Sequence, residues 1–152
     1  GCNNGLRINN ASSNNLIRNN TFIALKAGLY TFELTGGASG NVLQNNIFKG
    51  EAQAANLVLS NGDEFSESYN CWVGGTTEID PIDSTSITDD PQFADEDNND
   101  LRLNGDSPCI RAGTKWWGGA PPQDKTAEPY PSWDTSMGAI QSRDVPSHPT
   151  QL

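Results

Sequence analysis

The sequence is poor in the residue types that support common catalytic and metal chemistry. Its single histidine, His148, lies in a Pro-rich tail, which argues against Ser-His or Cys-His catalysis and against His-ligated zinc. Its three cysteines, Cys2, Cys71 and Cys109, form no CxxC motif, so neither a disulfide framework nor a zinc site is indicated. A Gly-rich phosphate loop of the GxGxxG or Walker type is also missing.

Positive charge and long apolar runs are scarce as well. Lys and Arg number 9 against 19 Asp and Glu, which gives a formal net charge of -10. Nucleic acid and anionic membranes select clustered Lys or Arg, so we expect neither as a partner. No run approaches the roughly 20 apolar residues of a membrane span, and no signal peptide is present. We therefore expect no membrane span, and a mature or excised segment of a protein.

What the sequence does contain is a repeat with an Asn-x-aromatic motif. The motif occurs as Asn20-Thr21-Phe22, as Asn46-Ile47-Phe48 after 26 residues, and as Asn70-Cys71-Trp72 after another 24. The residues upstream repeat too, because residues 15–19 (NLIRN) match residues 41–45 (NVLQN). A fixed spacing of this size is typical of a chain that coils and stacks one supersecondary unit on the next.

Stacking of the repeats predicts two columns of side chains. Amides at the repeated Asn position would hydrogen-bond from layer to layer and so satisfy buried polar groups. Aromatic rings two residues later would face the same way and stack. The predicted structural ladder consists of Asn20, Asn46 and Asn70 with Phe22, Phe48 and Trp72.

The secondary structure expected from the sequence is almost entirely β. Short apolar or alternating runs between Asn, Gly and Ser clusters predict strands, and only residues 51–56 could form a helical turn. The predicted strands are Leu6–Ile8, Leu16-Ile17, Tyr30–Leu34, Val42-Leu43 and Leu57–Leu59. Residues 1–75 are expected to form the coils. Residues 76–152 would supply the last strands, one of them at residues 137–140, and a cap of the same domain that covers the last apolar layer.

From Asn70 onward a series of motifs resembles a known group of proteins. The series is Asn70-Cys71-Trp72, Asp90-Pro91-Gln92-Phe93, Asp100-Leu101-Arg102-Leu103, Ser107-Pro108-Cys109-Ile110-Arg111-Ala112-Gly113 and Met137-Gly138-Ala139-Ile140. It is similar to the C-terminal end of right-handed parallel β-helix proteins of the pectate-lyase-like superfamily, above all the bacterial secreted type called choice-of-anchor Q. The resemblance implies an all-β, right-handed parallel β-helix of about three coils with an irregular C-terminal cap.

The chain departs from this family pattern in three places. Arg111 stands where the family usually has Asp, and Ser136-Met137 stand where an Asp commonly precedes the Gly-Ala strand. Any salt bridge or turn made by those acids is therefore in doubt here. Relatives also have more coils upstream, whereas Gly1-Cys2-Asn3 begins inside the pattern. We expect either a truncated segment or a chain whose open first coil stacks on another copy or a partner.

The resemblance implies a protein that binds or acts on polysaccharides, often acidic ones, in a groove along the parallel strands. Lyases of the superfamily use Lys or Arg as the base, with calcium or a second base neutralising the uronate carboxylate. Here Arg18 lies opposite Gln44 in the repeat, so no basic column forms. We expect Arg18 and Lys49 to be exposed to solvent rather than catalytic.

Two groups of residues are candidates for ligand binding. Trp116 and Trp117, with Tyr130 and Trp133, either form a sugar-stacking platform or anchor the cap to the last coil. The second group lies in the acidic segment 95–100.

In that segment Asp95, Asp97 and Asn99 place oxygen ligands at alternate positions, as at the start of a calcium loop. The segment lacks the Gly and the distal Glu of an EF-hand, and the alternative is a solvated acidic turn. Ca²⁺ is thus the one cofactor that the sequence suggests. Cys71 and Cys109 are the pair most suited to a disulfide in an oxidising compartment, although small buried thiols are the more ordinary interpretation.

Three functions remain open at this point. The first is an extracellular polysaccharide-associated module, with a binding or accessory role, secreted or on the surface of a bacterial cell. The second is a calcium-assisted polysaccharide lyase whose catalytic residues lie partly outside this chain. The third is a structural subunit of an extracellular assembly, which self-associates through its open N-terminal coil.

Overall fold

The structure is a computed structural model, and it describes residues 4–24, 30–50, 55–59, 64–77, 79, 81–114 and 136–138. This part of the chain is all-β, with one short 3₁₀ helix. The strands are β1 (Asn4–Ile8), β2 (Leu16–Arg18), β3 (Thr21–Ala24), β4 (Tyr30–Leu34), β5 (Asn41–Gln44), β6 (Ile47–Gly50), β7 (Ala55–Leu59), β8 (Phe65–Ser68), β9 (Cys71–Val73), β10 (Thr76–Thr77), β11 (Phe93–Asp95) and β12 (Asp100–Leu103), and the 3₁₀ helix is η1 (Glu96–Asn98). Among these residues no helix has the length and apolar character of a membrane span.

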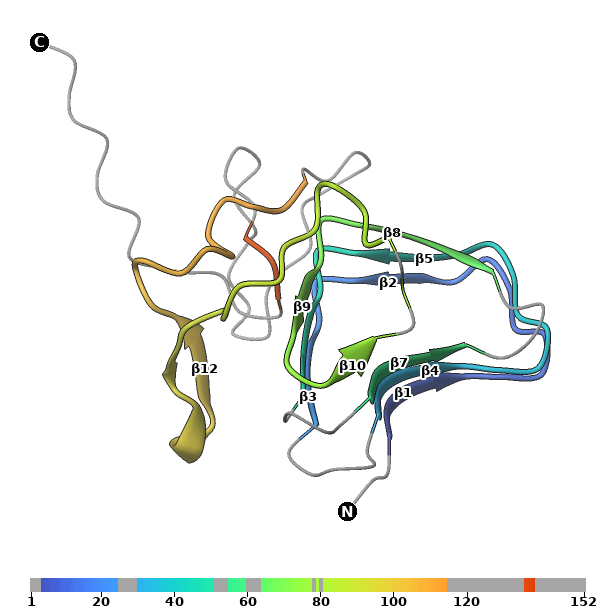
Figure 1. The fold of residues 1–152 in the computed structure, drawn as a ribbon, viewed down its shortest axis with the longest axis horizontal. Coiled ribbons are helices and arrows are strands. Elements are labelled where there is room, and N and C mark those ends of the chain that lie inside the picture. The colour runs from blue at the N-terminus through green and yellow to red at the C-terminus, as the bar shows by residue number, and fades with distance from the viewer. Residues whose placement is uncertain are drawn as a thin grey trace, which may run out of the picture.

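Most strands of the described region pair in parallel with the strand three places along the chain. The parallel sheets have the strand orders β1-β4-β7-β10, β2-β5-β8 and β3-β6-β9, and β11 and β12 form an antiparallel pair. In Figure 1 the three parallel sheets lie on three sides of a common interior, with equivalent strands one behind another. Each passage of the chain through the three sheets therefore forms one layer, which pairs with the next.

The pairing register equals the sequence repeat. Leu16 pairs with Val42 and Phe22 with Phe48, both at the 26-residue spacing. Phe48 in turn pairs with Trp72, at the 24-residue spacing. Equivalent positions of successive repeats are thus neighbours across a parallel ladder, so each side chain lies above its counterpart.

The repeated asparagines form a hydrogen-bonded column at the corner before β3, β6 and β9. The Asn46 side-chain oxygen accepts from the backbone N–H of Asn20 at 3.0 Å and from its side-chain amide at 3.2 Å. The Asn70 oxygen accepts the same two bonds from Asn46, at 2.9 and 3.0 Å. Asn46 and Asn70 are fully buried. Each amide thus satisfies backbone groups at a corner where the sheet ladder is interrupted.

The residue before each ladder asparagine adopts the left-handed conformation that turns the chain at this corner. The φ angles are 55° at Asn19, 57° at Asn45 and 54° at Tyr69. Asparagine tolerates this region better than most residues because its short side chain can hydrogen-bond locally. Backbone geometry therefore explains the Asn-Asn pairs of the first two repeats. Tyr69 adopts the same conformation at the third repeat, although it lacks the short side chain that makes this conformation favourable for asparagine.

The rings of the repeat fill the interior. Phe22 stacks on Phe48 with ring centroids 5.2 Å apart, and Phe48 stacks on Trp72 at 4.1 Å. Phe32 of β4 meets Phe48 edge-on at 6.1 Å. The other buried members of this inner core are Ile8, Ile17, Leu34, Ala38 and Leu43.

The last layer is covered by residues 76–77, 79 and 81–87, in which hydroxyl side chains replace the ladder asparagine. Ser86 Oγ accepts from the backbone N–H of Asn70 at 2.9 Å, and Thr85 Oγ1 accepts from that of Tyr69 at 3.0 Å. Ile79 and Ile82 pack against the inner core. The amide column therefore continues into a fourth, shorter layer, 16 residues after Asn70.

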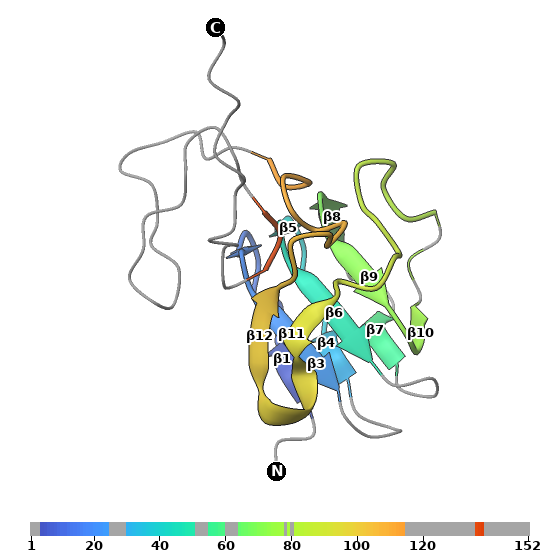
Figure 2. The same cartoon turned by 90° about the vertical axis from the view of Figure 1, so that its left-hand side faces the viewer.

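The described residues after position 88 lie on the flank of the stack rather than over its end. Figure 2 shows β11 and β12 in front of the sheet β3-β6-β9. A second apolar cluster forms there on the outer face of this sheet, from Ile47, Cys71, Phe93, Leu103, Cys109 and Met137. Both faces of β6 and β9 are consequently buried where they begin, because the described residues after position 88 form a lateral cover.

Two local predictions of secondary structure fall only partly within the described residues. Ala55 and Asn56 belong to β7 instead of a helical turn, whereas residues 51–54 lie outside the described residues. Met137 and Gly138 form a bend and not the start of a strand, and residues 139–140 lie outside the described part. Gly138 has φ of 94° and its N–H donates to the Asn45 carbonyl at 2.8 Å, so this segment is tied to the second layer by a turn.

Candidate functional site

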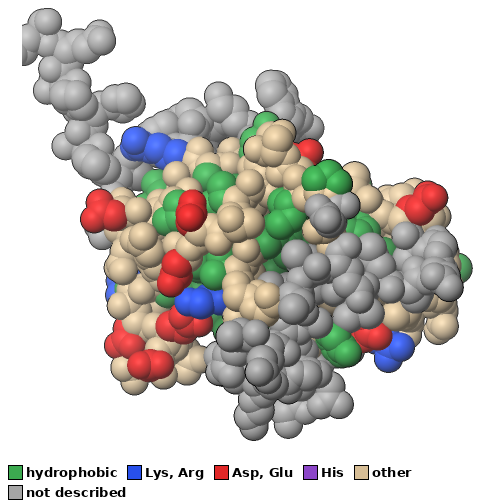
Figure 3. Space-filling model, in the orientation of Figure 1, with side chains coloured by type: hydrophobic (Ala, Val, Ile, Leu, Met, Phe, Trp, Pro, Cys, Tyr) green, Lys and Arg blue, Asp and Glu red, His purple; other side chains and the backbone are tan. Residues whose placement is uncertain are grey.

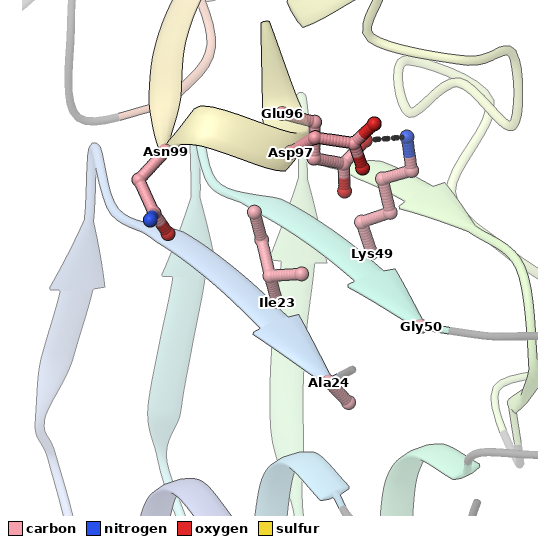
Figure 4. Close-up of a pocket in the computed structure, with 7 residues that line it drawn as sticks. All are labelled: Ile23, Ala24, Lys49, Gly50, Glu96, Asp97 and Asn99. Atoms are coloured by element: carbon pink, nitrogen blue, oxygen red, sulfur yellow. Dashed lines mark hydrogen bonds and ion pairs between the residues drawn. The ribbon is translucent and has the colours of Figure 1, made fainter. Parts of the chain in front are cut away.

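A pocket lies between the outer face of β3 and β6 and the hairpin formed by β11, η1 and β12. Its volume is about 400 Å³, which falls in the range of small-molecule pockets. The residues that line it are Ile23, Ala24, Lys49, Gly50, Glu96, Asp97 and Asn99. Figure 4 shows Ile23 and Lys49 rising from the two strands toward the hairpin, with Asn99 on the opposite side from Lys49.

Strand alternation explains why Lys49 faces this pocket. Phe48 is buried in the inner core, so its successor in β6 must point to the outer face. The register places Ile23 of β3 beside Lys49 in the layer before. The pocket therefore has an apolar wall next to a cation, and the second wall comes from the hairpin, whose Glu96 lies 47 residues after Lys49.

Lys49 is held between two carboxylates. Its Nζ lies 2.5 Å from Glu96 Oε2 and 3.4 Å from Asp90 Oδ1, and 5.6 Å from the centroid of the Phe93 ring. The Lys49 side chain is 20% exposed, so the expectation that it is a solvated lysine is wrong. Arg18, half-buried, likewise donates from Nη2 to the Thr114 carbonyl at 3.3 Å.

The electrostatics of the pocket keep Lys49 charged. Burial lowers the pKa of Lys49, but the hydrogen bond to Glu96 and the charges of Glu96 and Asp90 outweigh it, so the pKa is raised. The pKa of Asp90 is lowered, chiefly by the hydrogen bond from the Gln92 N–H and further by Lys49. A lysine that serves as a general base needs a pKa shifted toward neutrality, which is the opposite direction. Lys49 therefore acts here as a fixed cation and hydrogen-bond donor.

The acidic turn that carries the predicted calcium ligands is shaped by its own hydrogen bonds. Asp95 caps η1, and its two oxygens accept from the backbone N–H and side-chain amide of Asn98 at 3.3 and 2.8 Å. Asn99 ends η1 with φ of 61°. Asp97 and Asn99 both line the pocket, whereas Asp95 does not.

The structure thus brings two of the three predicted calcium ligands to one pocket. In the described part of the chain, His, Cys, Asp and Glu side chains form no group of three or more that could hold a metal ion. Figure 3 shows acidic side chains gathered on the left-hand side of the molecule, where the hairpin of β11 and β12 lies. Calcium at Asp95, Asp97 and Asn99 stays a prediction.

The aromatic platform expected from Trp116, Trp117, Tyr130 and Trp133 lies outside the described residues. The described pocket instead includes Glu96, and its Lys49 contacts Asp90 and the Phe93 ring, three residues that sequence reasoning did not assign to a site. The signal that could have found Asp90 and Phe93 is the Asp90-Pro91-Gln92-Phe93 motif, which the family resemblance singles out. Their partner Lys49 is too distant in sequence for a local pattern to reveal the contact.

Comparisons of the chain with protein-family models, with curated proteins and with solved structures give no match. The function must therefore be inferred from the geometry and from the sequence resemblance alone.

Proposed function

We propose that the chain is part of a right-handed parallel β-helix of the pectate-lyase-like kind, and that it serves as an extracellular polysaccharide-associated module that binds neutral sugar residues. The architectural part of the proposal is supported by three parallel sheets whose register equals the repeat. The extracellular location rests on the family resemblance.

The pocket over β3 and β6 is the single observation that supports the binding role. It combines the apolar surface of Ile23 with a charged donor in Lys49, a carboxylate in Asp97 and an amide in Asn99. A sugar ring presents apolar C–H faces together with hydroxyls that both donate and accept, so it can use each of these groups. Because the sheet fixes Ile23 and Lys49, one wall of the pocket is preorganised for binding.

The charge of the pocket selects the class of sugar. Glu96 and Asp97 line the pocket together with Lys49, whose ammonium group also pairs with Asp90. A uronate would add a further negative charge beside them, and like charges in a partly buried site repel. The ligand that fits is a neutral oligosaccharide. The same charge pattern, with the raised pKa of Lys49, gives no support to a lyase that uses Lys49 as its base.

The binding role is tested by titrating the full chain with neutral and with uronic acid oligosaccharides and following backbone amide shifts by NMR. We expect shifts confined to β3, β6 and η1 with neutral sugars only. Asp97→Ala should weaken that binding at least about tenfold if it removes one well-placed charged hydrogen bond. Arg102→Gln is the matched control, because Arg102 lies on the same hairpin, pairs with Asp100 and does not line the pocket. Shifts with uronates alone, or none with any sugar, would refute the proposal.

A second candidate function is self-association through the first layer. Within the described part of the chain, β1, β2 and β3 are each the outermost strand at one end of their sheets, so their backbone groups can pair with a further strand. Leu16 on β2 is 54% exposed beside a hollow lined by Leu6, Arg7, Ile8, Asn9, Ser12, Asn15 and Ile17. Light scattering would test this role. We expect dimers or longer stacks for the wild type and monomers for Leu16→Glu, whereas monomeric wild type at all concentrations would exclude it.

A further inference from the structure

The flank of the stack buries two cysteines in one apolar cluster. Cys71 begins β9, and Cys109 lies in the turn that runs from Ser107 to Arg111. Both side chains are fully buried in the same outer apolar cluster, and the neighbouring Cys109 raises the pKa of the Cys71 thiol. The Cys71 Sγ also donates to the Asp89 carbonyl at 3.3 Å. Both cysteines are free thiols in this structure.

Each sulfur is positioned by a separate part of the fold. On the sheet side, the Cys71 N–H donates to the Asn46 carbonyl at 2.8 Å, which fixes β9 against β6. On the flank side, the Cys109 N–H donates to Ser107 Oγ at 3.2 Å, and the Cys109 carbonyl accepts from Met137 N–H at 3.0 Å. The two thiols are therefore held at the junction between the layered sheets and the segment that covers them.

We propose that Cys71 and Cys109 are an oxidisable pair that forms an intramolecular disulfide when the protein meets a small-molecule disulfide such as oxidised glutathione. One cysteine thiolate attacks a sulfur of the glutathione disulfide, and one glutathione thiolate leaves. The second cysteine then attacks the resulting mixed disulfide and displaces the other glutathione. The protein loses two S–H bonds and gains one S–S bond, while two protons and two electrons leave with the two glutathione thiols.

The bond would tie the wall of the pocket to the sheets. The loop that it closes runs from residue 71 to residue 109 and contains β11, η1 and β12. That loop supplies Glu96, Asp97 and Asn99 to the pocket and Asp90 to Lys49. Oxidation thus reduces the conformational entropy of the unfolded chain. In the folded chain it links the segment after β12 covalently to β9, whichever ligand the pocket binds. The inference does not depend on the proposed sugar binding.

Exchange of these thiols should be slow, because both sulfurs are covered. Hydrogen bonding to Cys109 and burial raise the pKa of the Cys71 thiol, so little thiolate exists in the closed structure. Oxidation therefore needs transient opening of the flank segment, and its rate reports that opening.

The test uses the full chain with Cys2→Ser, because Cys2 lies outside the described residues. The protein is equilibrated in mixtures of reduced and oxidised glutathione, alkylated under denaturing conditions, digested and analysed by mass spectrometry. We expect a crosslinked peptide pair carrying Cys71 and Cys109, and a thermal midpoint that rises on oxidation and returns after dithiothreitol. Finding both cysteines alkylated in the oxidised sample, or each bound to glutathione without a crosslink, would overturn the proposal.

The variants Cys71→Ser and Cys109→Ser give a second readout. Made in the Cys2→Ser chain, each retains one cysteine, and each should form no crosslink and show the same thermal midpoint in oxidising and reducing buffer. The crosslink assay on the Cys2→Ser chain needs neither variant, so it decides the question even where a variant fails to fold.

Discussion

Asn46 is the interior rung of the amide column, and its replacement by Ala should be among the most destabilising polar substitutions in the chain. Its side-chain oxygen accepts from the backbone N–H of Asn20, and its amide donates to the Ile17 carbonyl at 2.9 Å. Ala at this position removes both bonds at a corner where Asn46 is fully buried, and it leaves the Asn20 N–H without this acceptor. The Asn70 oxygen is less affected, because the backbone N–H of Asn46 still donates to it.

The magnitude follows from one lost hydrogen bond and one group left without its partner. A hydrogen bond contributes about 0.5–1.5 kcal/mol and a buried donor without a partner costs about 1–3 kcal/mol, so Asn46→Ala should cost about 2–4 kcal/mol. With a urea m value of about 2 kcal/mol per M, a loss of about 4 kcal/mol lowers the unfolding midpoint by about 2 M. That is a large part of the stability of an ordinary domain, which is about 5–15 kcal/mol.

Asn20→Ala is the matched control, since it makes the same change at the open end of the same column. Asn20 is only half-buried, and its amide donates to the Arg18 carbonyl at 2.8 Å and to the Asn46 oxygen. Water can replace the first bond, and the Asn20 backbone N–H still satisfies the Asn46 oxygen, so the loss should be about 1 kcal/mol. Urea unfolding followed by circular dichroism measures both variants. Equal losses for the two, or a loss below about 1 kcal/mol for Asn46→Ala, would refute the reasoning.

Three further predictions concern the core, one glycine and the pocket. Phe48→Ala should lower the free energy of unfolding, measured in urea, by about 3–5 kcal/mol, because Phe48 is fully buried between two stacked rings. A decrease below about 1 kcal/mol would contradict the aromatic column. Gly74→Ala should lower the free energy of unfolding by about 1–3 kcal/mol more than Gly37→Ala. Both glycines have positive φ, but of the two only Gly74 would bring a Cβ into collision with backbone, at the Gly50 carbonyl oxygen. Equal losses of stability in the two variants would count against the close approach of these layers. The raised pKa of Lys49 means that its ion pairs contribute fully below its ordinary value of 10.5, and that the contribution is lost as pH rises through the raised pKa. Between pH 7 and pH 11 the free energy of unfolding should therefore fall by about 0.5–1 kcal/mol more for wild type than for Lys49→Met. Equal decreases for the two proteins would show that the ion pairs do not contribute to stability.

Much of the layered region could be predicted because its information is periodic. The strands expected at Leu6–Ile8 and Tyr30–Leu34 are present, and the Asn-x-aromatic spacing equals the pairing register. A period of this kind needs no knowledge of distant contacts, since each repeat encounters the same environment. The stacking of Phe22, Phe48 and Trp72 follows from that register.

The end of the stack and its flank could not be predicted in the same way. In the fourth layer Ser86 takes the place of the asparagine after a shorter interval. Its hydroxyl accepts the same backbone hydrogen bond, but a search for the Asn repeat does not find a serine. The hairpin of β11 and β12 covers an outer sheet face, and no local pattern separates that arrangement from an end cap. The ion pair of Lys49 with Glu96 joins residues 47 positions apart. The local sequence therefore predicts an ordinary solvated lysine.

In-register stacking of the asparagine and aromatic columns is tested most directly by proton NMR of the full chain. Nuclear Overhauser contacts should link the rings of Phe22 to Phe48 and of Phe48 to Trp72, and the side-chain amide protons of Asn46 should contact the side chain of Asn70 and exchange slowly with solvent. Contacts from Phe48 to neither ring, together with rapidly exchanging Asn46 amide protons, would contradict the layered architecture and the pocket built upon it.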